Sequence, residues 1–245
     1  MNEMEIIPLG TVSPYCKNEL NCPGFLVKYN KYSILLDCGN GISRYLDFPN
    51  ILNNLYVFVT HLHSDHYGDL STIEYASYVY NNLGLLSEKP KIYTPNGCNR
   101  YKNINYCDYY TLNENTFVKL GDLKICFHNN NSHDIESYMI KLENNKTKIV
   151  YTSDIGNTNI DDVVRFSNNA DLLICESSLL RIHKKSKTHL CAYEAAIIAK
   201  EAKVNKLLLT HFWPEIDKQE YLNEASLIFD NTDVALENKK IILKK

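Results

Sequence analysis

The chain has 245 residues, 44% hydrophobic and 22% charged, so it can bury a sizeable core and has the composition of an ordinary globular protein. No stretch approaches the unbroken apolar length of a membrane span, and the N-terminus lacks the basic and apolar regions of a secretory signal, so we expect a cytoplasmic protein without a membrane partner. The formal net charge of -3 argues against broad electrostatic capture of nucleic acid.

The first half of the chain predicts mainly β-structure. Residues 25–29 and 33–37 flank a polar turn, as the strands of a hairpin do. Residues 55–60 form a short apolar run that is typical of a buried strand. Residues 70–83 carry apolar side chains at helical spacing and predict an amphipathic helix. Further strands are expected at 91–94, 117–120 and 123–127.

The second half alternates predicted strands with predicted helices. We expect strands at 137–142, 148–152, 172–175 and 206–210, and helices at 160–166, 192–203 and 218–229. Two packed sheets with helices on their outer faces, a four-layer αββα sandwich, fit this order of elements. We expect a single domain over residues 1–245, with two halves that divide near residue 120.

Three of the apolar runs lead into a residue type that binds metals. His61 follows the run that ends at Thr60, Asp154 follows residues 149–153, and His211 follows residues 207–210. A strand end is a rigid mount, and loops at one edge of a sandwich can converge on one site. Metal coordination needs such mounting because its geometry is strict.

The segment 60–66 is the densest group of candidate ligands. His61 and His63 alternate, so an extended backbone would point both side chains the same way. Asp65 and His66 follow where the chain turns into a helix, so they can face a second metal. A lone histidine in a loop would usually be a satisfied polar residue. Three histidines and an aspartate directly after an apolar strand favour a metal site.

This segment resembles the HxHxDH signature of metallo-β-lactamase-fold hydrolases. Segments 9–11, 36–39, 131–133, 151–154 and 210–211 are also similar to that family, so the resemblance covers nearly the whole chain. It implies two divalent metal ions, with Zn as the default and Mn or Fe suiting the same ligands. The implied ligands are His61, His63 and His133 for the first metal, Asp65, His66 and His211 for the second, and Asp154 as the bridge between them.

Segments 188–196 and 206–211 resemble the phosphodiesterase branch of this family, which includes RNase Z and cyclic-nucleotide phosphodiesterases. Segment 172–178 resembles the HEAT-like strand end of the branch, with Cys175 in place of its first histidine. The resemblance implies that His189 contacts the phosphate undergoing cleavage and that Glu176 orients His189. It also implies that Asp65 orients the nucleophilic water besides binding metal.

One departure from RNase Z bears on the substrate. RNase Z enzymes carry a long basic arm between the third histidine motif and the bridging aspartate, whereas only residues 134–153 lie between His133 and Asp154 here. We therefore expect a small phosphodiester such as a cyclic nucleotide, with RNA ends as an alternative substrate. Dimerisation is common in the branch, so a homodimer is among the expected assemblies.

Two other classes of function are kept as alternatives. A hydrolase of lactones, thioesters or β-lactams would use the same metal ligands, but it would have no need of His189 and Glu176. A metal-binding or redox module without hydrolysis is the second alternative. Flavodiiron oxygen reductases resemble this family but carry a carboxylate where this chain has His63, and no flavin domain follows here.

Several other residues leave two interpretations open. Lys184–Lys187 could form a phosphate-attracting lip or a solvated loop, and Trp213 could wall the pocket or serve packing alone. His128 also follows a predicted strand, but His133 fits the register of the family better. The eight cysteines are scattered without a CxxC pair, so we expect small buried or half-buried thiols.

Overall fold

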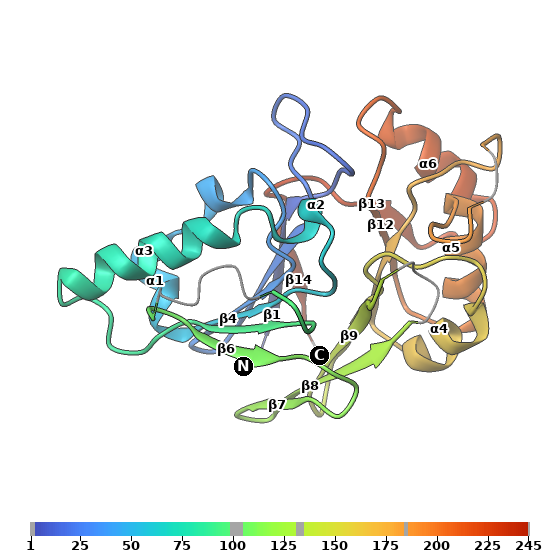
Figure 1. The fold of residues 1–245 in the computed structure, drawn as a ribbon. Coiled ribbons are helices and arrows are strands. Elements are labelled where there is room, and N and C mark those ends of the chain that lie inside the picture. Colours follow the sequence, from blue (N-terminus) through green and yellow to red (C-terminus); the bar gives the residue numbers. More distant parts are fainter. Residues whose placement is uncertain (1–2, 99–104, 131–134, 184–185, 245) are drawn as a thin grey trace.

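The computed structural model describes residues 3–98, 105–130, 135–183 and 186–244. Two seven-stranded sheets face each other, and helices cover their outer faces (Figure 1). The predicted four-layer αββα sandwich is therefore confirmed. The helices found within the described ranges are all too short or too polar to cross a membrane.

The first sheet has the strand order β14-β1-β2-β3-β4-β5-β6 and the second has the order β13-β12-β11-β10-β9-β8-β7. The strands of the first sheet are β1 (Met4–Gly10), β2 (Gly24–Tyr29), β3 (Tyr32–Leu36), β4 (Leu55–Phe58), β5 (Lys91–Thr94), β6 (Asp108–Thr111) and β14 (Ile241–Leu243). Those of the second are β7 (Phe117–Leu120), β8 (Leu123–Asn129), β9 (Tyr138–Glu143), β10 (Lys148–Tyr151), β11 (Leu172–Glu176), β12 (Leu207–Thr210) and β13 (Thr232–Val234).

The helices lie mainly on the outside of the sandwich. They are α1 (Phe48–Ile51), α2 (Ser64–Tyr67), α3 (Leu70–Asn82), α4 (Ile160–Ser167), α5 (Ala192–Glu201) and α6 (Lys218–Ser226). Figure 1 shows α1 and α3 beside the first sheet and α4, α5 and α6 beside the second. The short α2 begins directly after His63, so it carries the second half of the histidine-rich segment.

Strand periodicity explains how the layers pack. Along β3, Ile34 and Leu36 enter the core between the two sheets, whereas Leu35 joins the cluster under the helices of the first sheet. The same split occurs in β4, where Phe58 faces the second sheet and Val57 faces outward. Successive strand residues point to opposite faces, so a sheet with both faces covered must be apolar throughout.

The predicted elements lie where they were expected, within a few residues at their ends. The hairpin of β2 and β3 is antiparallel, with Val27 opposite Ile34. The predicted helix at 70–83 is α3, which ends at Asn82. The prediction missed β1, β6, β13 and β14, and it extended the last helix three residues beyond Ser226. The missed strands lie at or next to a sheet edge, where a strong hydrophobic pattern is not required.

Parallel pairing places several chain segments at one end of the sandwich. β10, β11 and β12 pair in parallel, so the segments after all three leave the second sheet at the same edge. β3 and β4 also pair in parallel in the first sheet. The residues that follow these strands include most of the candidate site residues. The topology therefore brings together groups that are far apart in the sequence.

Candidate metal centre

Asp37 connects the two sheets beneath the centre. It follows β3 directly and is fully buried. Its Oδ1 accepts hydrogen bonds from the Thr60 backbone N–H at 2.7 Å and from the Thr60 hydroxyl at 2.9 Å. Its Oδ2 accepts one from the Tyr151 hydroxyl at 2.8 Å and lies 2.8 Å from Nδ1 of His66. In the sequence, only the turn at 36–39 resembles the family, and nothing there predicts these contacts of Asp37.

Three histidines, which we call the inner histidines, are buried and have one ring nitrogen backed by a polar partner. They are His61, His66 and His211. The partners of their Nδ1 atoms are Thr60 Oγ1 at 3.1 Å, Asp37 Oδ2 at 2.8 Å and Ser178 Oγ at 2.8 Å, respectively. Metal-binding histidines in proteins are commonly held in this way.

The backing partners of two inner histidines define which nitrogen is available to a metal. An ionised Asp37 only accepts hydrogen bonds, so it favours the tautomer of His66 with the proton on Nδ1. The Ser178 hydroxyl donates its proton to Glu176, so towards His211 its oxygen acts as the acceptor. In both rings a lone pair is then left on Nε2, the atom that would bind a metal.

The Nε2 atoms of the inner histidines converge on Asp154. Those of His211 and His66 lie 2.9 and 3.2 Å from Asp154 Oδ1, and that of His61 lies 3.5 Å from Oδ2. Asp154 thus faces one histidine with one oxygen and two with the other. This is the arrangement expected of a carboxylate that bridges two metal positions.

Asp65 approaches the same group from the start of α2. Its Oδ2 lies 3.7 Å from the Nε2 atoms of both His66 and His211. The same oxygen accepts a hydrogen bond of 2.8 Å from Ser13, which fixes the carboxylate. Ser13 lies in the segment between β1 and β2, and the sequence analysis did not identify it.

His63 lies at the edge of this group. It is only partly buried, and its Nδ1 lies 3.2 Å from Nε2 of His61. His133, the remaining ligand that the sequence predicted, falls outside the described residues. Among the described residues, three overlapping sets bring ligand atoms within 4.8 Å of one another: His61, His66 and Asp154; Asp65, His66 and His211; Asp154, His189 and His211.

His189 lies at the edge of the group on the side of the second sheet, with 30% of its side chain exposed. Its Nδ1 is 2.9 Å from Oε1 of the buried Glu176, and its ring stacks on that of His211 at a centroid distance of 5.5 Å. Glu176 is fixed in turn by the backbone N–H groups of Ile155 and Ser178. The structure thus brings Glu176 and His189 into contact, and the orienting role that the resemblance implies for Glu176 stays a prediction.

The buried carboxylates and imidazoles of the centre shift one another's pKa values. Burial lowers the pKa of His211, but Asp154 and Asp65 raise it by more, to about 10. Burial also lowers the pKa of His66, which Asp154 and Asp37 then raise well above its usual value. Burial raises the pKa of Asp154, but His211, His66 and His61 bring it well below its usual value. The buried carboxylates thus require positive charge beside them.

Three residues of the centre have a backbone in the left-handed region. Asp37 has φ of 59°, Ser153, directly before Asp154, has φ of 56°, and His211 has φ of 66°. Non-glycine residues in this left-handed region cost roughly 1–3 kcal/mol each and gather at functional sites. These residues follow β3, β10 and β12, where the chain leaves the sheets.

The chemistry of these donors fits divalent metal ions. Imidazole nitrogens and carboxylate oxygens are the ligands that Zn, Mn and Fe take in proteins. The carboxylates of Asp154 and Asp65 and the Nε2 atoms of the inner histidines face the same small volume. Two of the overlapping sets of three ligand atoms share His66, and two share Asp154.

Comparisons with known proteins identify the family. A family model described as the Beta-lactamase superfamily domain matches residues 32–212, a span that begins with β3 and ends just after His211. The chain belongs to the beta-lactamase superfamily. It is accordingly a metal-dependent hydrolase, and the resemblance inferred from the HxHxDH segment is confirmed.

Relatives within the beta-lactamase superfamily cover most of the chain. The probable metallo-hydrolase YhfI of Bacillus subtilis is 28% identical over 84% of this chain and 86% of its own. Ribonuclease Z of Thermococcus sibiricus is 30% identical over 92% of this chain and 91% of its own. The crystal structure of YhfI has a TM-score of 0.89, with 24% identity over 98% of this chain and 100% of the other, which shows the same superfamily fold.

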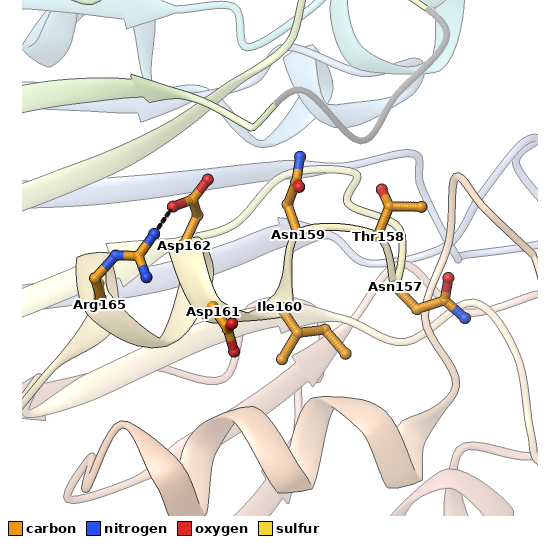
Figure 2. A pocket seen from close by; sticks show the side chains of 7 residues that line it. All are labelled: Asn157, Thr158, Asn159, Ile160, Asp161, Asp162 and Arg165. Carbon is orange, nitrogen blue, oxygen red and sulfur yellow. Dashed lines mark hydrogen bonds and ion pairs between the residues drawn. The ribbon is translucent and has the colours of Figure 1, made fainter.

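A polar pocket of about 410 Å³ lies on the segment that follows Asp154 and begins α4. Figure 2 shows the side chains of Thr158, Asn159 and Asp162 on one side of this segment, with Asp162 paired to Arg165. Asn159 donates a hydrogen bond of 3.2 Å to the backbone carbonyl of Asn130, at the end of the β8 segment.

The other residues that the sequence analysis singled out have varied positions. Lys184 and Lys185 fall outside the described residues. Of the cysteines, Cys16 is exposed and the other seven are buried or partly buried, so that expectation fails at one position. The Sγ atoms of Cys16 and Cys22 lie 3.6 Å apart, a proximity that the spacing of six residues did not predict. Trp213, two positions after His211, is partly exposed.

Proposed function

We propose that this superfamily member is a phosphodiesterase that uses two divalent metal ions, most readily Zn, to hydrolyse a small phosphodiester such as a cyclic nucleotide. The proposed ligands are His61, His63 and His133 for one metal, Asp65, His66 and His211 for the other, and Asp154 between them. The inner histidines and Asp154 support this set because their ligand atoms already face one another.

The observation that carries the phosphodiesterase proposal is the pair formed by His189 and Glu176. A partly exposed imidazole, oriented by a buried carboxylate at 2.9 Å, stands beside the ligand atoms of Asp154 and His211. A phosphodiester needs such a group, because cleavage develops negative charge on phosphoryl oxygens and expels an alkoxide. Hydrolysis of a lactone or β-lactam has no comparable need of a fixed imidazole at this position.

In this mechanism the protein holds the reactants and moves protons. When bound, the metal ions supply an activated water near neutral pH and a clamp for the charge of the phosphoryl oxygens. Asp65, fixed by Ser13, orients the attacking water. Glu176 accepts a hydrogen bond from the Nδ1–H of His189 and stabilises the imidazolium form of the ring. The Nε2–H of that imidazolium is the group that can stabilise the phosphoryl oxygen or give its proton to the leaving alkoxide, which leaves His189 neutral.

Cleavage of RNA ends is the second candidate, and the similarity to the Thermococcus sibiricus ribonuclease Z favours it. The segment between His133 and Asp154 supports the smaller substrate. Its described part forms the antiparallel pair β9–β10, closed by a short turn in which Asn144 donates to the Thr147 carbonyl at 3.0 Å. That hairpin belongs to the second sheet rather than reaching outward to hold the body of an RNA.

The proposal is tested by reloading the purified protein with Zn or Mn and assaying matched substrates. Bis-p-nitrophenyl phosphate reports phosphodiesterase activity, 2′,3′- and 3′,5′-cyclic nucleotides report small natural diesters, and an RNA with a 3′ extension reports endonuclease action. A chromogenic β-lactam and a lactone cover the other hydrolase classes. His63→Ala serves as the metal-site variant and His128→Ala as a matched histidine variant outside the centre.

We expect metal-dependent turnover of the diester and of a cyclic nucleotide, lost in His63→Ala and kept in His128→Ala. If the protein cleaves the extended RNA but does not hydrolyse the cyclic nucleotides, it is an endonuclease, the second candidate. Turnover of the β-lactam or lactone by a metal-loaded protein that leaves every phosphodiester intact would contradict the proposal.

A further inference from the structure

Trp213 is an exposed aromatic residue in the segment that follows the candidate ligand His211. It is the only tryptophan of the chain, and 39% of its surface is accessible. It follows the metal-ligand candidate His211 by two positions, with the fully buried Phe212 between them. A large aromatic side chain that is anchored but not buried is a common feature of binding sites.

The backbone around Trp213 is held on both sides. The N–H of Ser13 donates to the Phe212 carbonyl at 2.9 Å, and the N–H of Phe212 donates to the Thr11 carbonyl at 3.0 Å. The N–H of Trp213 itself donates to the Tyr221 hydroxyl at 3.3 Å. The same segment that carries Ser13, and through it fixes Asp65, therefore also fixes the position of Trp213.

Two more rings lie on segments that contact the segment of Trp213. The ring of His183 lies 5.1 Å from that of Trp213, tilted by 47°. Tyr15, with 48% of its surface accessible, donates a hydrogen bond of 3.0 Å to Glu215, two residues after Trp213. We call Tyr15, His183 and Trp213 the aromatic rim. Their three segments connect to the centre through Ser13, Ser178 and His211, respectively.

We propose that Trp213 is the platform on which the nucleobase of the substrate stacks, with His183 and Tyr15 completing the aromatic rim. This inference rests on the phosphodiesterase activity proposed above and narrows its substrate to diesters that carry a nucleoside. Any of the nucleobases can stack on an exposed indole ring, because each base has a π-face. The rigid backbone lowers the entropic cost of forming the stack.

The test compares two esters with the same leaving group. Thymidine 5′-(p-nitrophenyl) phosphate carries a base and methyl p-nitrophenyl phosphate does not. In Trp213→Leu, we expect the ratio of the two KM values to shift against the thymidine ester by about 5- to 150-fold, the worth of one base–aromatic stack. Trp213→Phe should restore much of the ratio, and Tyr78→Leu, which removes an aromatic ring from α3, should leave it unchanged.

A binding readout separates this inference from the activity. Because Trp213 is the only tryptophan, its fluorescence reports its own surroundings. Nucleoside 5′-monophosphates should quench it saturably, whereas ribose 5-phosphate should not. If neither ester is hydrolysed, the activity proposed above fails and the quenching still decides the role of Trp213. Unquenched fluorescence, or an unchanged KM ratio in a folded Trp213→Leu protein, would overturn the stacking platform.

Discussion

The histidines of the centre divide into two regions with different surroundings. The inner histidines are buried and each is backed at Nδ1. His63 and His189, which we call the outer histidines, are partly exposed at the edge. Burial with a polar partner behind Nδ1 suits a permanent metal ligand, whereas the partial exposure of His189 suits a group that must also meet substrate, and that of His63 suits a ligand at the rim of the centre. The two regions should therefore respond differently to the same substitution.

The largest effect is expected from an inner histidine. His211→Ala removes an Nε2 atom that faces both Asp154 and Asp65, so metal retention should fail and phosphodiester turnover should drop about a thousandfold or more. Metal content by mass spectrometry and kcat/KM measure the two results. A chelator should lower the Tm of the wild type but not that of the variant. A fully metallated His211→Ala protein would refute the inner role.

His189→Ala tests the outer region. Loss of the oriented imidazole should lower kcat by about 10²- to 10⁴-fold, the usual worth of a general acid or base, while the metal content stays that of the wild type. Glu176→Gln, which keeps the size but weakens the pairing with Nδ1, should give a smaller loss of the same kind. Because the ligand atoms of His189, Asp154 and His211 lie within 4.8 Å of one another, loss of metal from His189→Ala would reclassify it as a ligand.

Ser178 connects the two regions and should show an intermediate effect. Its hydroxyl donates to Glu176 at 2.9 Å and lies 2.8 Å from Nδ1 of His211. Ser178→Ala should weaken metal affinity by about 10- to 100-fold, as loss of a partner behind a ligand commonly does. Ser178→Thr retains the hydroxyl and should bind metal as the wild type does. Equal metal affinity of the alanine and threonine variants would show that the hydroxyl of residue 178 does not determine the tautomer of His211.

The contiguous part of the centre was predictable because its signal is local. Three histidines and an aspartate lie within one hexapeptide, and Asp154 and His211 each follow an apolar run whose strand character is clear. The positions of Glu176 and His189 came from the resemblance to the phosphodiesterase branch. The four-layer architecture followed from the order of strands and helices.

The supporting groups were not predictable because they act across long sequence distances. Tyr151 meets Asp37 from the opposite sheet, 114 positions away, and Ser13 meets Asp65 over 52 positions. No periodicity records such contacts. The edge strand β6 was missed for a related reason, since its exposed tyrosines give no alternating pattern, and β14 is a three-residue strand that pairs with β1 at the other end of the chain.

The smallest effect is expected from a histidine that belongs to neither region. His128 is the second-last residue of β8, in the same polar stretch that leads towards His133. Its ring stacks on Phe166 at a centroid distance of 5.5 Å, and its Nδ1 lies 3.4 Å from Glu114. The partly exposed pair with Glu114 is worth little in water, so His128→Ala should change the free energy of unfolding by no more than about 1 kcal/mol. Metal content and kcat/KM should match the wild type, as denaturant unfolding and the assays above would measure. A loss of metal in this variant would mean that His128 supplies a ligand in place of His133. His128 would then have to be counted among the histidines of the centre.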